Sequence, residues 1–212
     1  MAPVAFGVVC ISSDDGAAAA EAAELVADSL GFRLINEDIV ARAAVEAGVD
    51  HDVVADVERR KSTLAKLLEG MAPAAMASGA LTLAPEDLGY GQLGSNELRG
   101  LIRSAIEETA STGNVVIVAH AASLALAARN DVLRVLITAS PQTREQRLAA
   151  SLAVDEKEAA RLRKRSDAGR AEYMKRFYGV GSELPTHYDL VVNTDRLTPD
   201  DAARLIVDAA SG

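Results

Sequence analysis

Short runs of mostly β-branched and other apolar residues alternate with stretches of helical character along most of this chain. The runs lie at Val4–Ile11, Phe32–Ile35, Val115–Val118, Val132–Thr138 and Leu190–Val192. Runs of this kind are typical of strands that are covered on both faces, and their alternation with helices is typical of a parallel sheet with crossover helices. The sequence therefore predicts an α/β fold with a five-stranded parallel sheet and helices on both faces.

The stretches between these runs are predicted helices, and several have recognisable ends. Gly31 and Gly48 follow the first two helices as stop signals, and Thr198 with Pro199 provides a cap and a first-turn proline for the last. The predicted helices lie at Ala17–Leu30, Glu37–Ala47, Asp52–Glu69, Asn96–Thr109, Ser123–Ala128, Pro141–Leu152, Asp155–Phe177 and Pro199–Ala209.

Two segments interrupt the alternation within what we expect to be a single domain over residues 1–212. Residues 50–95 form an insertion between the second and third strands, and its part Gly70–Ser95 is rich in glycine and proline, which predicts a long loop. Residues 155–180 form a long charged segment before the fifth strand, which predicts one helix or a helix pair.

The composition limits the partners of the chain. Lys and Arg number 22 against 31 Asp and Glu, so the net charge of −9 opposes binding to nucleic acid or to anionic membrane surfaces. Aromatic residues make up 3% of the chain, which excludes a base-stacking platform. Cys10 lies inside an apolar run and is predicted to be a core thiol. With no apolar run near the roughly 18 residues of a membrane helix, we expect a soluble, cytoplasmic protein.

The turn after the first strand lies where a P-loop binds phosphate through backbone N–H groups at a helix start. Ser13, Gly16 and Ala17 are the candidate phosphate-binding residues there. The turn has one glycine, no basic residue and two carboxylates, Asp14 and Asp15, which would repel a polyanion. The alternative is a structural role in which Ser13, Asp14 or Asp15 caps the first helix.

A basic segment between Arg134 and Arg176 has the opposite charge balance. It contains eleven Lys and Arg and six Asp and Glu, so it carries +5 and leaves −14 on the remainder. Arg163, Asp167 and Arg170 are spaced four and three apart, which places them on one face of a helix. Such a strip can clamp a transferring phosphoryl group, or it can be a solvated face with internal ion pairs.

Other polar candidates follow the predicted strands. Asp38 comes after the second strand and His120 after the third, at the sheet edge where open α/β proteins bind ligands. Both also suit an ordinary helix start. His51 and His187 are predicted loop residues, and no cluster has the spacing of a metal site.

These residues make the chain similar to the cytidylate kinase-like family, a branch of the nucleoside monophosphate kinase P-loop fold. The resemblance runs in order along nearly the whole chain and is strongest in the last third. It is carried by Ile11–Gly16, Ala22–Phe32, Asn36–Val40, Gly113–Val118, Asp167-x-x-Arg170-x-x-Tyr173, Phe177–Val180 and Tyr188–Thr194.

The resemblance implies ATP-dependent transfer of a phosphoryl group to a pyrimidine nucleoside monophosphate, with Mg²⁺ and a mobile lid at residues 155–180. Arg163 and Arg170 would contact phosphates and Asp167 would orient them. The ATP side would include Ser13, Gly16, Ala17 and Arg165, and the acceptor side would include Asp38, Arg103 and His120.

Two departures from the family pattern fall at its phosphate-binding elements. Gly16–Ala20 stands where a sequence like G-S-G-G-R is usual, and Ala119–Ala122 stands where G-R-G-A is usual. Because phosphoryl transfer depends on positioning and charge, we expect weakened or lost kinase activity. The alternatives are a pseudokinase that binds a protein partner or forms a homodimer, and an enzyme that reuses the cleft with His120 and Asp14 or Asp15.

Overall fold

The computed structural model describes residues 6–36, 95–119 and 122–212. Several predictions lie outside these residues. They are the helices at Glu37–Ala47 and Asp52–Glu69, the loop at 70–94, and the candidate site residues Asp38 and His120.

The described residues contain a five-stranded parallel sheet in the order β2-β3-β1-β4-β5, which confirms the predicted fold class. Most strand bounds lie within a residue or two of the apolar runs. The strands are β1 (Val8–Ser13), β2 (Arg33–Asn36), β3 (Val115–Val118), β4 (Val132–Thr138) and β5 (Leu190–Asn193).

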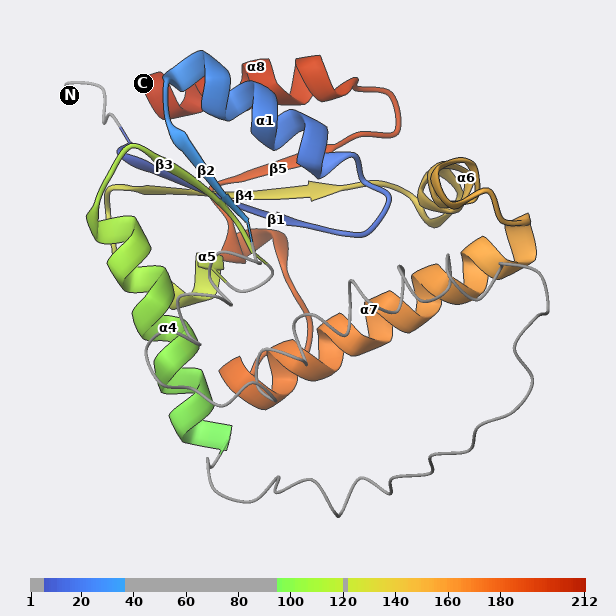
Figure 1. Cartoon of the computed structure of the whole chain (residues 1–212), viewed down its shortest axis with the longest axis horizontal. Coiled ribbons are helices and arrows are strands. Elements are labelled where there is room, and N and C mark those ends of the chain that lie inside the picture. Colours follow the sequence, from blue (N-terminus) through green and yellow to red (C-terminus); the bar gives the residue numbers. More distant parts are fainter. Residues whose placement is uncertain (1–5, 37–94, 120–121) are drawn as a thin grey trace, which may run out of the picture.

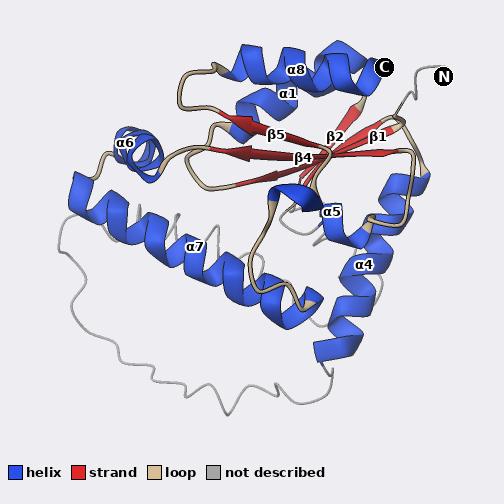
Figure 2. Ribbon diagram, turned by 180° about the vertical axis from the view of Figure 1, so that it is seen from behind, coloured by secondary structure: helices blue, strands red, loops and turns tan. Residues whose placement is uncertain are grey.

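Helices cover both faces of the sheet (Figures 1 and 2). Helices α1 and α8 lie on one face and α4 and α5 on the other, while α7 runs back beneath the sheet from α6. The residues predicted as one helix or a helix pair form the single helix α7. The bounds are α1 (Ala19–Leu30), α4 (Ser95–Ser111), α5 (Ala122–Ala125), α6 (Pro141–Leu152), α7 (Glu156–Tyr178) and α8 (Pro199–Ser211), with a 3₁₀ turn at Pro185–His187.

Strand β1 is the centre of the core, because its side chains are buried on both faces. Val9 and Ile11 belong to the apolar cluster beneath α1 and α8, whereas Val8 and Cys10 belong to the cluster against α4 and α5. This alternation follows from the two-residue period of a strand. Burial raises the pKa of the Cys10 thiol to about 12, which confirms the predicted core thiol. No helix in the described ranges is long and apolar enough to cross a membrane.

Local sequence signals determine several helix ends as predicted. Gly31 ends α1 in the left-handed region, with φ 66°. Thr198 caps α8 and Pro199 opens it, while the Asp201 carboxylate accepts a hydrogen bond from the Thr198 N–H. The Asp155 side chain also caps α7, by accepting a 2.8 Å hydrogen bond from the Glu158 N–H, although no cap was predicted there from the sequence.

The strand order places the carboxyl end of β1 at a topological switch point. The chain passes from β1 to β2 and β3 on one side and then crosses to β4 and β5 on the other. In open α/β sheets, ligands bind in the crevice outside the carboxyl ends of strands at such a point. The loop after β1 is therefore the first place to look for a site.

A prediction follows from the C-terminus of α6. Ala153 ends this helix with φ 52°, a conformation that costs a residue with a Cβ roughly 1–2 kcal/mol. Because its side chain is exposed, Ala153→Gly should raise the free energy of unfolding by about 1 kcal/mol in chemical denaturation. Ala150→Gly, at an exposed position within the same helix, is the control and should lower it by a similar amount. Equal losses in both variants would contradict the prediction.

Candidate active site

The loop between β1 and α1 does not cap the helix in the predicted way. Helix α1 has Ala18 as its N-cap, without a side-chain hydrogen bond, so the expectation that Ser13, Asp14 or Asp15 caps it is wrong. The helix begins only at Ala19. The two carboxylates bind elsewhere instead. Asp14 accepts a 2.7 Å hydrogen bond from the Thr138 hydroxyl, and Asp15 accepts one from the Ser166 hydroxyl on α7.

The carbonyl oxygens of this loop accept hydrogen bonds from side chains on α6, on α7 and on the residue that follows β5. These contacts are Arg170 to the Ser13 carbonyl, Arg144 Nε to Asp15 (2.7 Å), Arg147 to Gly16 (3.3 Å) and Thr194 Oγ1 to Ala17 (2.9 Å). By contrast, the described residues offer no acceptor to the backbone N–H groups of Asp15, Gly16 and Ala18. The loop thus has its carbonyls tied to its surroundings and N–H groups available for an anion.

Gly16 is required by a close backbone contact. Its φ is +81°, and a Cβ atom at this position would lie 2.7 Å from the carbonyl oxygen of Arg144 in the first turn of α6. An L-residue with a side chain would therefore meet both strain and a clash. Ala18 keeps a left-handed conformation (φ 59°) although it has a Cβ. The loop retains a tight fold with a single glycine.

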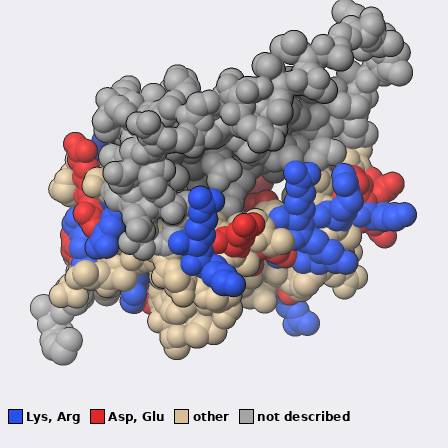
Figure 3. Space-filling view, turned by 90° about the horizontal axis from the view of Figure 1, so that it is seen from below, with Lys and Arg blue, Asp and Glu red and all other residues tan. Residues whose placement is uncertain are grey.

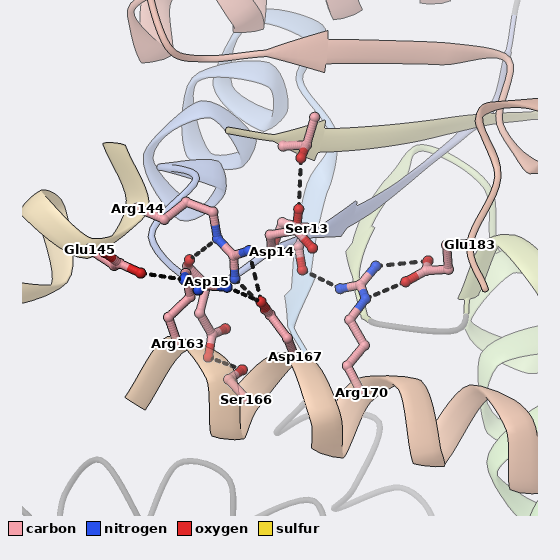
Figure 4. A network of polar contacts seen from close by, with 11 residues as sticks. Ser13, Asp14, Asp15, Arg144, Glu145, Arg163, Ser166, Asp167, Arg170 and Glu183 are labelled. Atoms are coloured by element: carbon pink, nitrogen blue, oxygen red, sulfur yellow. Dashed lines mark hydrogen bonds and ion pairs between the residues drawn. The ribbon is translucent and has the colours of Figure 1, made fainter. Parts of the chain in front are cut away.

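Two arginines share one carboxylate beside this loop (Figure 4). Arg144, whose side chain is 6% exposed, donates from two nitrogens to Asp167, with distances of 2.5 and 3.3 Å. Arg163 donates to the same carboxylate at 2.7 Å and to Glu145 at 2.8 Å. The hydrogen bond to Glu145 is the largest cause that raises the pKa of Arg163, so this guanidinium is firmly charged.

Arg170 is held by a second carboxylate. Glu183 accepts hydrogen bonds from two nitrogens of Arg170, and it also accepts one from the Tyr188 hydroxyl. Burial acts to lower the pKa of Arg170, but the bound Glu183 carboxylate outweighs it and the net shift is upward. Burial and the same carboxylate raise the pKa of Tyr188 to about 12. Arg170 is therefore a permanent cation, and Tyr188 remains protonated near neutral pH.

A cavity of about 180 Å³ opens between the loop after β1 and α7. Its charged lining consists of two arginines, Arg144 and Arg170, and three carboxylates, Asp14, Asp167 and Glu183. The other lining residues are Ala171, Met174, Val180, Gly181 and Ser182. Without a ligand the lining carries a net negative charge, so a phosphate group would need a cation with it.

The sequence left open whether α7 is a solvated face with ion pairs or a strip that faces a ligand site, and the two sides of the helix differ in this respect. Its outer side carries exposed ion pairs such as Arg161 with Glu158, at 2.7 Å. Figure 3, which views the molecule from below, shows Lys and Arg side chains beside Asp and Glu. The inner side of α7 brings Asp167 and Arg170 to the cavity. Arg163 reaches the cavity only through Asp167, and Arg165 is exposed.

The predicted acceptor residues are not brought to this cavity within the described residues. Arg103 is exposed on α4 and pairs with Glu107 at 2.7 Å, which raises its pKa, and it does not line the cavity. Asp38 and His120 lie outside the described residues. No group of three or more potential metal ligands occurs in the part of the chain that the structure describes.

Two residues of the site, Arg144 and Glu183, escaped the sequence analysis. Arg144 was counted in the basic segment, but its spacing from Asp167 follows no helical period because the two residues lie on different helices. Glu183 lies in the connection after α7, where no periodic pattern marks a partner for Arg170. Contacts between elements distant in sequence leave no local signal.

Comparisons with known proteins find relatives by sequence and by structure. A cytidylate kinase from Pyrobaculum arsenaticum is 32% identical over 113 residues, which cover 53% of this chain and 60% of that protein. A crystal structure of an uncharacterised protein from Eubacterium ventriosum has the same fold, with a TM-score of 0.67, 16% identity and coverage of 96% of this chain and 97% of that one. Residues 8–196 match the cytidylate kinase-like family, and the chain therefore belongs to that family.

Proposed function

We propose that this chain binds a nucleoside triphosphate at the loop after β1 and that its transfer of a phosphoryl group to a nucleoside monophosphate is weak. The main support for this proposal is that the loop keeps its tight backbone and its available N–H groups, although it has no basic residue of its own. Such a loop supports binding of a phosphate chain. The loop lacks, however, one of the cations that accelerate phosphoryl transfer.

The size of the expected loss follows from the chemistry. Phosphoryl transfer is catalysed almost entirely by positioning and by cations beside the transferring group, and one such arginine contributes roughly 10³–10⁵ in rate. Position 20, where a basic residue would be expected, holds an exposed alanine at the start of α1. We expect cytidylate kinase activity to fall by an amount of this order relative to a complete loop.

Mg²⁺ would enter with the nucleotide. The cavity carboxylates are oxygen donors of the type that Mg²⁺ prefers, but Asp14 is bound to Thr138 and Asp167 to two arginines. The described residues thus fit a hydrated metal–nucleotide complex better than a metal ion held by protein alone. When bound, the ion would neutralise phosphate charge that the three cavity carboxylates otherwise repel.

The first test is calorimetric titration with ATP, with and without Mg²⁺, and with CMP, together with an assay of phosphoryl transfer. We expect ATP to bind at least about tenfold more tightly with Mg²⁺, because the cavity lining is net negative. We also expect slow but measurable transfer to CMP. Absence of binding by a folded protein would overturn the proposal and favour the pseudokinase that acts through a protein partner.

Restoring the missing charge gives a second test. Ala20 is exposed, so Ala20→Lys introduces a cation beside the loop without a steric clash. We expect ATP affinity to rise about tenfold or more, since each unit-charge contact is of the order of kcal/mol near a protein surface. Ser29→Lys, exposed at the other end of α1, adds the same charge away from the loop and should leave affinity unchanged. An equal gain in both variants would show a nonspecific charge effect.

The pair Arg170 and Glu183 gives a third test, because the two side chains should act in opposite directions. Arg170→Gln removes a cavity cation and should lower ATP affinity, whereas Glu183→Gln removes the carboxylate that competes with phosphate for Arg170 and should raise it. The measurement is the Kd for ATP with Mg²⁺ at temperatures where both variants are folded. A loss of affinity in both would mean that the pair only holds the structure.

A further inference from the structure

Because the loop has no basic residue, binding of a nucleotide there requires positive charge from a side chain elsewhere in the fold. The inference that follows rests on the proposed nucleotide binding and assigns that side chain. In the part of the chain that the structure describes, four arginines on α6 and α7 contact the loop or the carboxylates around it. They are Arg144, Arg147, Arg163 and Arg170.

Arg144 has its position relative to the loop fixed from two sides (Figure 4). Its backbone carbonyl packs where a Cβ of residue 16 would be, at 2.7 Å, so the first turn of α6 is in direct contact with the loop. Its side chain then turns back, and Nε donates to the Asp15 carbonyl at 2.7 Å. The guanidinium cannot move far from the loop without breaking one of these contacts.

The guanidinium of Arg144 is also buried and held in one orientation, and not all of its N–H groups have an acceptor in the described residues. Its side chain is 6% exposed and lines the cavity. A guanidinium has five N–H groups, and those of Arg144 have three acceptor contacts in the described part of the chain, one with Asp15 and two with Asp167. Two N–H groups therefore remain for a ligand. Asp167, the carboxylate that Arg144 contacts in the described residues, is shared with Arg163, so the charge of Arg144 is only partly compensated.

The other arginines are less suitable. Arg147 gives its donors to the Gly16 carbonyl and to Thr194, and it does not line the cavity. Arg163 pairs with Glu145 and Asp167 behind Arg144. Arg170 lines the cavity, but Glu183 holds it through two hydrogen bonds.

We propose that Arg144 binds the phosphate chain of the nucleotide in place of the basic residue that the loop lacks, and that Asp167 is a positioning residue for it. Positive charge for binding is thus supplied from α6, across the loop, whereas the cation that would assist transfer from the first turn of α1 is still absent. Paired N–H donors of a guanidinium match two oxygens of one phosphate group, which gives the contact both strength and direction.

The test uses inorganic triphosphate with Mg²⁺ as a probe, because it has the phosphate chain and no base. We compare Arg144→Gln with Arg161→Gln, since both variants remove an arginine that pairs with a carboxylate, and only the first removes a cavity cation. We expect Arg144→Gln to weaken triphosphate and ATP binding at least about tenfold. Arg161 is exposed and contacts neither the loop nor the cavity, so Arg161→Gln should change triphosphate affinity by less than about twofold.

The outcomes separate the two proposals. Wild-type protein that binds neither ATP nor triphosphate overturns the proposed function. Wild-type protein that binds both, with unchanged affinity in Arg144→Gln or an equal loss in Arg161→Gln, overturns only the role of Arg144. If Arg144→Gln does not fold, Arg144→Lys keeps the charge but loses the paired donors and should bind triphosphate with intermediate affinity. Affinity equal to wild type in Arg144→Lys and in Asp167→Asn would then contradict the proposal.

Discussion

The contact between the loop after β1 and the first turn of α6 is the constraint on which the site depends. Gly16 packs against the Arg144 carbonyl, and the Arg144 side chain returns to hold the Asp15 carbonyl. Together with Arg147, Arg170 and Thr194, this contact occupies the carbonyl side of the loop with donors from α6, α7 and the residue after β5. The loop is therefore shaped from outside, which explains how Ala18 keeps a left-handed conformation normally given to glycine.

The charges of the site are arranged as an internal network. Asp167 joins α7 to Arg144 on α6, and Glu183 joins the connection after α7 to Arg170. Buried guanidinium groups need such partners, because an unpaired buried charge is costly. The same pairs limit what the arginines offer to a ligand, so the +5 charge of the basic segment overstates its attraction for phosphate. The local balance of two arginines against three carboxylates is the relevant quantity.

Much of the fold could be predicted because its signals are local. The apolar runs predicted all five strands of the described residues, and Gly31 and Thr198 predicted two helix ends, since hydrophobic period and capping act within a few residues. Asp167 and Arg170 were also placed correctly on one face of α7. The capping role of Ser13, Asp14 or Asp15 was wrong, because contacts with Thr138 and Ser166 decided where the two carboxylates bind.

The sequence by itself determined that the chain forms a parallel α/β sheet, that β1 lies in its core, and that a short loop without a basic residue follows this strand. Each of these features depends on residues adjacent in sequence. Which side chains surround that loop depends on the tertiary structure, because Arg144, Asp167 and Glu183 reach the cavity from α6, from α7 and from the connection after α7. A charge that is absent from one element can be replaced from another only where packing brings the two together, and α6 is packed on the loop at Gly16.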